Sequence, residues 1–316
     1  MTRQDNLYDL VVIGAGPAGL TAAIYASRSR MSVLVIEEML SGGQIATTDK
    51  MENYPGFPEG VGGLEFGQLL EDQARKFGAE MALATVETVS MHGDIKEVHT
   101  TEGVFRGRTL LIATGTRWRP LNVPGEAELK GKGVSYCVTC DGSFFQDREV
   151  MVVGGGDSAL EEALVMTKFA SKVYLVHRRD EFRAISILQE RIRANPKIEL
   201  VLNTVVEKIN GTINVESVTL YDKAQNKTWD VRVDGIFLYV GLLPNTEFLH
   251  RDLDVNEQGY ILTNEAMETS IPGVFAAGDL RDKVLRQVVT AVADGAVAAI
   301  SAARYLDEQS EKEDKK

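Results

Sequence analysis

A chain of 316 residues is long enough for about two domains, and 44% apolar with 25% charged residues is the composition of an ordinary globular protein. The formal charge of −12 disfavours binding to nucleic acid or anionic membranes, because both need clustered Lys and Arg. No apolar run reaches the roughly 18 residues of a membrane span, and residues 1–9 lack the basic-then-apolar pattern of a signal peptide. We therefore expect a cytoplasmic protein that binds neither nucleic acid nor a membrane.

The first predicted elements are a strand, a glycine-rich turn, a helix and a second strand. The first strand covers residues 10–13, the small-residue helix reaches about Arg28, and the second strand covers residues 32–36. The glycines follow the spacing G-x-G-x-x-G at Gly14, Gly16 and Gly19. A lone glycine motif is weak, but the complete pattern is the fingerprint of a dinucleotide-binding unit.

Each residue type in this turn has a physical task. Gly14 permits the tight turn, Gly16 lets the backbone approach a pyrophosphate, and Gly19 lets the helix pack on the strand. The start of the helix attracts phosphate charge, and Glu37 at the end of the second strand can accept hydrogen bonds from ribose hydroxyls. We therefore predict a site for FAD or NAD. The alternative is a tight packing turn without a ligand.

Two chain crossings define the expected domains. A buried strand at residues 110–113 leads into a segment punctuated by prolines, and a similar strand near residue 240 is also followed by glycine and proline. Residues 92–105 and 212–231 alternate as antiparallel strands that cover a sheet would. The expected fold class is α/β, with two Rossmann-like three-layer domains, one inserted in the other. Their predicted bounds are 1–117 with 247–316 for an FAD-binding domain, and 118–246 for an NADPH-binding domain.

The two cysteines, Cys137 and Cys140, are followed at once by Asp141. A zinc site needs four ligands, and no histidine has a partner spacing to the pair. The histidines are His92, His99, His177 and His250. A structural disulfide closing so short a loop would stabilise little, so we expect a redox-active pair and no metal. Asp141 can exchange the proton that an attacking or departing sulfur needs; the alternative is a turn role in the Asp-Gly dipeptide.

The dinucleotide pattern recurs after the cysteines. The small-residue places are taken by Gly154, Gly156 and Ala159. His177 occupies the place that Glu37 has in the first unit, and basic residues follow it. These are Arg178, Arg179 and Arg183. Guanidinium groups bind a 2′-phosphate that an acid would repel, so the second site should prefer NADPH. A solvated basic surface run is the alternative.

Near the C-terminus a strand at residues 274–277 delivers Gly278 and Asp279 into a loop, and a long helix follows from about Gln287. An Asp in this position can accept hydrogen bonds from the ribityl hydroxyls of a flavin. The positive start of the helix can stabilise the charge of a reduced flavin ring. A surface turn is the alternative role for Asp279.

With these residues the chain resembles the bacterial low-molecular-weight thioredoxin reductases over nearly its whole length. The motif CxxCDG at residues 137–142, just upstream of a second dinucleotide unit, is specific to them. The other matching segments are GAGPAG (14–19), SGGQ (41–44), ENYPG (52–56), ATG (113–115), GGGDSALEEA (154–163), HRRDEFRA (177–184), FAAGD (275–279) and RQVVTAVADG (286–295).

The resemblance implies FAD in the discontinuous domain, NADPH in the inserted domain, a homodimer, and thioredoxin as the protein substrate. It implies that Cys140 is the sulfur nearer the flavin and that Cys137 attacks the partner. The FAD contacts expected beyond Gly14, Gly16, Gly19 and Glu37 are Pro17, Ala18, Gly43, Gln44, Asn53, Ala113, Thr114, Gly115, Gly278, Asp279, Arg286, Gln287 and Val288. The NADPH contacts expected beyond the small residues, His177 and the arginines are Asp157 and Ser158.

The expected reaction carries electrons from NADPH through the flavin and the cysteine pair to thioredoxin. Because the cysteines and the NADPH site share one domain and the flavin occupies the other, we expect the inserted domain to rotate between half-reactions. Two alternatives stay open. One is a flavoenzyme that feeds a glutaredoxin-like, peroxidase-linked or ferredoxin-type acceptor, and the other is a redox-sensing flavoprotein without turnover.

Overall fold

The computed structural model describes residues 7–48, 50–249 and 252–314, so His250 lies outside the described residues. The chain divides into two units, Met1–Arg117 with Leu243–Lys316, and Trp118–Leu242. The return crossing therefore lies slightly earlier in the structure than the sequence pattern places it. The hydroxyl of Thr114 donates to the Asn245 carbonyl at 2.7 Å, and the Asn245 amide donates to the Thr114 carbonyl at 3.0 Å. These bonds attach the residues after the crossing to the first unit.

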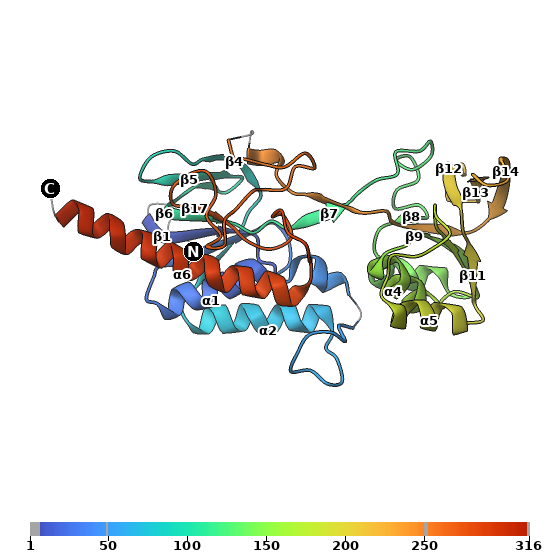
Figure 1. Ribbon diagram of the computed structural model, residues 1–316, viewed down its shortest axis with the longest axis horizontal. Coiled ribbons are helices and arrows are strands. Elements are labelled where there is room, and N and C mark those ends of the chain that lie inside the picture. The colour runs from blue at the N-terminus through green and yellow to red at the C-terminus, as the bar shows by residue number, and fades with distance from the viewer. Residues whose placement is uncertain (1–6, 49, 250–251, 315–316) are drawn as a thin grey trace. The chain divides into compact units, whose positions relative to one another are not determined.

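The first unit contains helices and strands from both ends of the chain (Figure 1). Its strands are β1 (Leu7–Ile13), β2 (Val33–Glu37), β3 (Glu80–Leu83), β4 (Val86–Ser90), β5 (Lys96–Thr100), β6 (Gly103–Ile112) and β17 (Val274–Ala276). Its helices are α1 (Pro17–Arg28), α2 (Gly63–Lys76) and α6 (Val288–Asp314), with 3₁₀ turns η1 (Gly43–Thr47) and η3 (Glu247–Leu249).

Strand β6 organises the sheet of the first unit. The strand order is β3-β2-β1-β6, and β1 pairs with β6 in parallel along the whole of β1. On its other side β6 changes partner: its first half pairs antiparallel with β5, and its last three residues pair parallel with β17. Strands β4 and β5 therefore belong to the same hydrogen-bonded sheet, and they also cover one face of its parallel part, as the sequence pattern predicted for residues 92–105.

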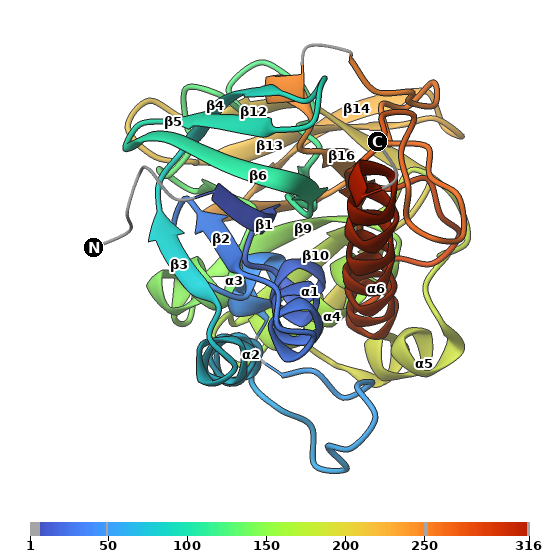
Figure 2. The ribbon, with the colours of Figure 1, turned by 90° about the vertical axis from the view of Figure 1, so that its left-hand side faces the viewer.

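Alternating residues of β1 separate the two cores of the first unit. Leu10 and Val12 are buried with side chains from α1, α2 and α6, whereas Val11 and Ile13 are buried with residues from β4 and β5. Figure 2 shows the three helices on one side of strands β1, β2 and β6, and β4 and β5 on the other. The parallel strands thus lie between a helical layer and an antiparallel layer.

Helix α6 packs closely on α1. A Cβ atom added at Gly295 would lie 2.1 Å from the carbonyl oxygen of Ala18, so only glycine permits this approach. Among the described residues Val288–Lys312 is also a helix long and apolar enough, by length and composition alone, to cross a membrane; its most apolar 18-residue window has a mean hydropathy of 1.3, and 33% of that window is buried. Its residues Ala298 and Ala299 are buried in the core with α1. Part of the apolar composition of this helix therefore serves packing within the first unit.

The second unit is built around a five-stranded parallel sheet in the order β11-β10-β9-β15-β8 and a three-stranded antiparallel sheet, β12-β13-β14. Its strands are β8 (Val134–Ser135), β9 (Glu149–Gly154), β10 (Lys172–Val176), β11 (Ile198–Val201), β12 (Thr204–Asn210), β13 (Ser217–Asp222), β14 (Lys227–Arg232) and β15 (Gly235–Tyr239). Its helices are α3 (Val138–Asp141), α4 (Asp157–Met166) and α5 (Ser186–Ala194), with the 3₁₀ turn η2 (Gly142–Phe145).

Strand β9 again separates two cores. Val150 and Val152 are buried with residues of α4 and α5, and Met151 and Val153 are buried with residues of β12 and β13. The layers are therefore helices, parallel sheet and antiparallel sheet, as in the first unit. Where the chain passes between the units, β7 (Thr116–Trp118) and β16 (Leu242–Pro244) pair with each other. The predicted fold class, two Rossmann-like α/β domains, is confirmed.

Candidate functional site

A cavity of about 770 Å³ lies in the first unit where β1, β2 and β6 end. Open α/β sheets bind ligands at this edge of their strands, and the volume is within the range of about 300–1,000 Å³ that is typical of ligand sites. Most of the predicted FAD contacts line it: Gly14, Gly16, Pro17, Ala18, Glu37, Gly43, Gln44, Ala113, Thr114, Gly115, Gly278, Asp279, Gln287 and Val288. The structure therefore brings together residues from both ends of the chain.

The glycine turn of the first unit has the geometry that a phosphate site needs. A Cβ atom at Gly14 would lie 2.5 Å from the Ala113 carbonyl oxygen, and one at Gly19 would lie 2.0 Å from the Gly14 carbonyl oxygen. Gly16, in contrast, has no atom within 4 Å of such a position, so its outer side faces open space. Gly16 is also the N-cap of α1 and provides no side chain for the first amide groups. These N–H groups are therefore available to a pyrophosphate.

Glu37 is held rigidly beside the cavity. Its Oε2 accepts a hydrogen bond from the Ala15 amide at 2.7 Å, and its Oε1 accepts from the amides of Glu38 and Met39 at 2.9 and 3.1 Å. A carboxylate has about four acceptor positions, so at least one stays available for a ribose hydroxyl. The surrounding backbone thus orients the acid that the sequence pattern singled out.

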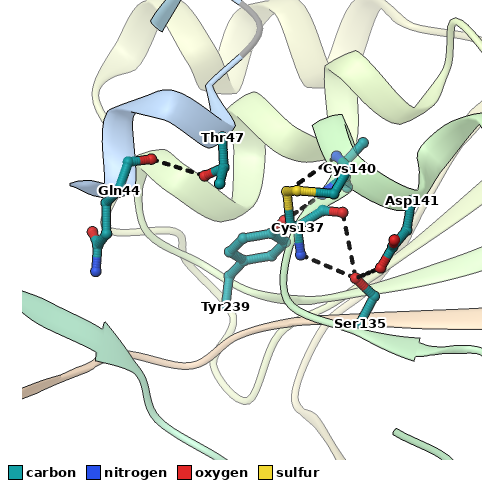
Figure 3. The surroundings of a disulfide bond; sticks show 8 residues. Gln44, Thr47, Ser135, Cys137, Cys140, Asp141 and Tyr239 are labelled. Carbon is teal, nitrogen blue, oxygen red and sulfur yellow. Dashed lines mark hydrogen bonds between the residues drawn. A yellow bond between two sulfur atoms is a disulfide. The ribbon is translucent and has the colours of Figure 1, made fainter. Parts of the chain in front are cut away.

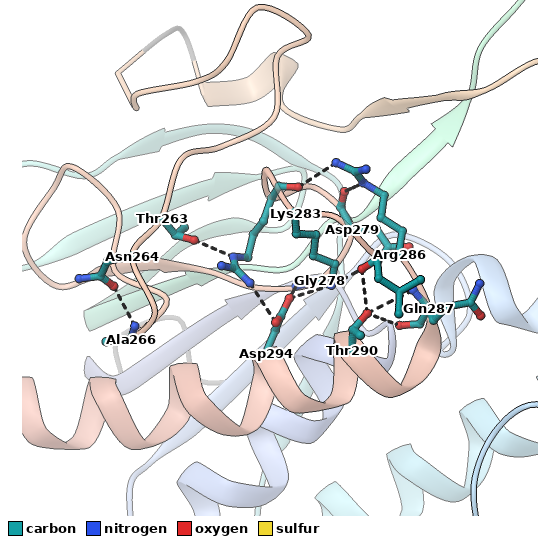
Figure 4. A network of polar contacts seen from close by, with 12 residues as sticks. Thr263, Asn264, Ala266, Gly278, Asp279, Lys283, Arg286, Gln287, Thr290 and Asp294 are labelled. Atoms are coloured by element: carbon teal, nitrogen blue, oxygen red, sulfur yellow. Dashed lines mark hydrogen bonds and ion pairs between the residues drawn. The ribbon is translucent and has the colours of Figure 1, made fainter.

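Asp279 carries an unsatisfied oxygen atom into the cavity wall. Its Oδ1 is buried and forms no hydrogen bond with the described residues, and the Lys283 ammonium lies 3.7 Å away, too far for a hydrogen bond (Figure 4). Burial raises the pKa of Asp279, although the charges of Lys283 and Arg286 oppose the shift. A buried acceptor without a hydrogen bond is costly, and a hydroxyl-rich ligand chain would donate one. The residues present therefore fit the ribityl chain of FAD.

Asp279→Asn is expected to stabilise the flavin-free protein at neutral pH by about 1 kcal/mol, because the neutral amide avoids the burial of a carboxylate charge that raises the pKa of Asp279. Because folding raises the pKa of Asp279, the folded state holds this proton to higher pH than the unfolded chain. The free energy of unfolding of the parent should therefore fall as pH rises from the ordinary Asp value through the raised one. Urea unfolding of flavin-stripped protein across this interval measures the effect. An unchanged pH slope in the Asn variant would contradict the prediction.

Three predicted FAD contacts lie outside the wall of this cavity. Gly19 lies inside helix α1, where it packs against the backbone of Gly14. The Asn53 amide donates to the Gln287 side chain at 3.0 Å, so Asn53 holds a wall residue in place. The Arg286 guanidinium lies 3.9 Å from the centre of the Tyr260 ring and donates to the Asp279 carbonyl at 3.1 Å, so it supports the loop that carries Asp279.

The cavity wall also contains residues that the sequence pattern did not identify. Thr116 accepts a hydrogen bond from the Gln44 amide at 3.0 Å on its hydroxyl, and Arg117 donates to the Asn245 side chain at 3.0 Å. Arg117 also pairs with Glu247. A polar cluster directly after a strand end and a proline, as in the segment PNTE, is the signal that could have found Asn245 and Glu247.

The glycine turn of the second unit repeats this geometry. A Cβ atom at Gly154 would lie 2.5 Å from the Ala159 Cβ, and Gly156 has no atom within 4 Å of such a position. Gly156 is the N-cap of α4 and provides no side-chain cap. The Asp157 carboxylate is engaged by the Ile185 amide at 2.9 Å, and Ser158 is exposed. This turn therefore also offers unpaired amide groups to a phosphate.

His177 and the arginines after it have different environments. The His177 side chain is buried, and its ring occupies the space beside Gly155 and lies 3.1 Å from the Glu181 carbonyl through Nε2. Burial, together with the arginine charges, lowers the pKa of His177, so the ring is neutral near neutral pH. The three arginines are exposed and form no ion pair within the described part of the chain: Arg178, Arg179 and Arg183. The Arg183 amide donates to the Gly155 carbonyl at 2.8 Å, next to the glycine turn.

Cys137 and Cys140 form a disulfide, with Cα atoms 5.4 Å apart, at the start of α3 (Figure 3). The Cys140 amide donates to the Cys137 sulfur at 3.1 Å, and the Val138 amide donates to the Tyr239 hydroxyl at 3.1 Å. Asp141 accepts a hydrogen bond from the Ser135 hydroxyl at 2.6 Å. Within the described ranges no group of three His, Cys, Asp or Glu side chains could hold a metal ion.

A second cavity, of about 580 Å³, adjoins this motif in the second unit. Ser135 and Asp141 line it, together with Phe144 and Ile213, whose side chains are 79% and 75% exposed. Large exposed apolar side chains beside a reactive group are typical of a surface that meets a partner. The motif therefore has an accessible and partly apolar approach.

Comparisons with known proteins agree with this geometry. Residues 8–295 match the family described as pyridine nucleotide-disulphide oxidoreductase. The thioredoxin reductase of Bacillus subtilis (strain 168) is 46% identical over 311 residues, which cover 98% of each chain. The crystal structure of Lactococcus lactis thioredoxin reductase (FR conformation) is 42% identical with a TM-score of 0.93, covering 95% of this chain and 99% of that one. The T. acidophilum thioredoxin reductase structure is 33% identical with a TM-score of 0.91, covering 96% and 99%. The chain therefore belongs to the pyridine nucleotide-disulphide oxidoreductases and, among them, to the thioredoxin reductase family.

Proposed function

We propose that this protein reduces the disulfide of a thioredoxin with electrons from NADPH. Like its family, it uses FAD and NADPH and is a disulfide oxidoreductase. The observation that carries the proposal is the Cys137–Cys140 disulfide with Asp141 beside it, in a chain that contains two separate dinucleotide turns. Two nucleotide sites and one dithiol are the parts that such a relay requires.

We assign FAD to the first unit and NADPH to the second. Support for the first assignment comes from the cavity, the fixed Glu37 carboxylate and the unsatisfied Asp279 oxygen. Support for the second comes from the uncapped α4 and the exposed arginines beside its turn. The neutral, buried His177 is better suited to supporting the turn than to binding a phosphate. When bound, NADPH supplies hydride and FAD passes two electrons to the disulfide.

Each residue of the CxxCD motif then has its own step in the thiol–disulfide exchange. After reduction, Cys137 attacks the partner disulfide, and Cys140 resolves the mixed disulfide by attacking Cys137. Asp141 takes the proton of the attacking thiol and returns it to the departing sulfur. We place the partner at the second cavity, which Phe144 and Ile213 line, because Asp141 also lines this cavity. Rotation of the inserted domain between half-reactions stays a prediction from the sequence.

We also propose that the protein is a cytoplasmic homodimer. Helix α6 leaves Val289, Val297 and Ile300 partly exposed, and their spacing places them on one side of the helix. A second copy of the chain would cover this apolar stripe. The reducing cytoplasm is the compartment in which dithiol exchange of this kind operates.

An assay with purified yellow protein, NADPH or NADH, and several thioredoxins tests the function, with consumption of the nucleotide followed by absorbance. We expect rapid turnover with NADPH and at least one thioredoxin. Turnover with a ferredoxin-type or glutaredoxin-like acceptor alone would contradict the proposal. Stable partner binding without consumption of NADPH would instead indicate a redox sensor.

Removing the arginine charges should weaken the use of NADPH much more than the use of NADH. Replacing Arg178 and Arg179 together by Gln is expected to raise KM for NADPH by about 30-fold, because charge-assisted hydrogen bonds to the 2′-phosphate are lost. KM for NADH should change less than about twofold, since NADH lacks this phosphate. Arg232→Gln, an exposed arginine on β14 of the same unit, is the matched control. Equal changes for both nucleotides would show that the arginines do not contact the phosphate.

A further inference from the structure

Ser135 lies at the centre of the redox motif although it is not part of CxxC. It ends β8, where Ser135 pairs with Phe237 of β15, and its side chain is 7% exposed. Its Oγ accepts a hydrogen bond from the Cys137 amide at 3.0 Å and lies 2.6 Å from Asp141 Oδ2 (Figure 3). One hydroxyl therefore connects the backbone of the first cysteine with the carboxylate of the acid.

The direction of the Ser135 hydrogen follows from the distances. A hydroxyl has one proton, and two acceptors are near: Asp141 Oδ2 at 2.6 Å and the Cys137 carbonyl at 3.3 Å. The Asp141 oxygen is closer by 0.7 Å, so the hydroxyl donates its hydrogen bond to Asp141. The described residues form no hydrogen bond with Asp141 Oδ1. One oxygen of the carboxylate is thus held in place while the other stays available for proton exchange.

Resting on the function proposed above, we infer that Ser135 is a positioning residue that aims Asp141 at the thiol–disulfide exchange. The backbone of Ser135 is fixed by the parallel sheet, whereas Asp141 lies at the end of a single helical turn, α3. Without the hydroxyl, Asp141 could turn about its side-chain bonds into the adjoining cavity, which it lines. Proton transfer is sensitive to such small displacements.

The exchange that this arrangement assists is balanced in atoms and electrons. The Cys137 thiol gives its proton to Asp141, and its sulfur attacks one sulfur of the partner disulfide, whose S–S bond breaks as the mixed disulfide forms. The first departing partner thiolate takes the proton from Asp141. The Cys140 thiol then gives its proton to Asp141, its sulfur attacks Cys137, and the second partner thiolate leaves with that proton. The partner gains two electrons and two protons, and the Cys137–Cys140 disulfide is restored.

The test compares Ser135→Ala with the parent in the full, flavin-loaded protein. We expect kcat with thioredoxin to fall about tenfold while KM for thioredoxin stays within about twofold, since positioning affects the proton step and not docking. NADPH-dependent reduction of ferricyanide, which takes electrons directly from the flavin, should be unchanged. Ser135→Thr keeps the hydroxyl and should retain at least about half of the parent kcat.

A double-mutant cycle separates this role from a purely structural one. In an Asp141→Asn background, Ser135→Ala should cause no further loss, because the group it positions no longer exchanges a proton. The same tenfold loss in that background would overturn the inference, and so would a Thr variant as slow as the Ala variant. Ser143→Ala, an exposed serine in η2, is the matched control and should behave as the parent. A parent that does not turn over with thioredoxin would refute the proposed function instead.

Discussion

Replacing either Cys137 or Cys140 by Ser is expected to lower NADPH-dependent thioredoxin reduction by at least about 10³-fold. The structure pairs these two sulfurs with each other, and they are the two cysteines of the chain. A serine at either position leaves no disulfide to accept two electrons and no thiol pair to resolve the mixed disulfide. Because the relay needs both sulfurs, the single variants should be as inactive as the double variant.

The measurement compares two acceptors in the same preparations. Reduction of ferricyanide by NADPH should persist in all three variants, because it needs the nucleotide sites and not the cysteines. A variant that loses both activities would have lost flavin or structure, which the yellow absorbance reports. Full thioredoxin turnover in the double variant would show that electrons bypass the cysteines, and it would favour a ferredoxin-type or other direct acceptor.

Asp294→Ala is expected to lower the free energy of unfolding by about 3 kcal/mol or more. Asp294 lies in α6, is 8% exposed, and pairs with the Arg281 guanidinium and the Lys283 ammonium, each at 2.9 Å (Figure 4). It also accepts the Gly278 amide at 3.0 Å. Removing one member of a buried ionic cluster leaves the others without compensation, and this typically costs about 3–5 kcal/mol.

The Asp294→Ala substitution should also weaken flavin binding. Gly278 and the adjoining Asp279 line the cavity, and Lys283 lies between Asp279 and Asp294. Urea unfolding and release of flavin fluorescence measure the two effects. Asp282→Ala, an exposed acid in the same loop, should change the free energy of unfolding by less than about 0.5 kcal/mol. An Asp294→Ala protein as stable as this control would show that the cluster contributes little.

The sequence around Asp294 contains a signal for this buried ion cluster. It is a lone acid in an otherwise small and apolar helix start, VVTAVADG, and three basic residues precede the helix: Arg281, Lys283 and Arg286. A charge on a helix that must be buried needs a partner, so the pattern itself indicates an ion pair. The sequence does not say which of the basic residues pairs with Asp294, or that the Gly278 amide also donates to it. Both depend on the path of the loop before the helix.

The fold class, the two glycine turns and the cysteine pair could be predicted from the order of the amino acids. Each of these depends on residues close together in the chain, where steric rules at glycine, strand and helix periodicity, and the spacing of two sulfurs act locally. The family match covers residues 8–295 and so includes all of these segments.

Which side chains meet across the sheets became clear only from the folded chain. The Ser135–Asp141 bond, the Asn245–Thr114 pair and the position of the His177 ring beside Gly155 were not predictable from spacing. His177 is the clearest case: the sequence grouped it with the arginines, but it lies at the end of a buried strand and packs inward. Contacts of this kind depend on the registers and packing of strands distant in the chain, which no local pattern of residue types specifies.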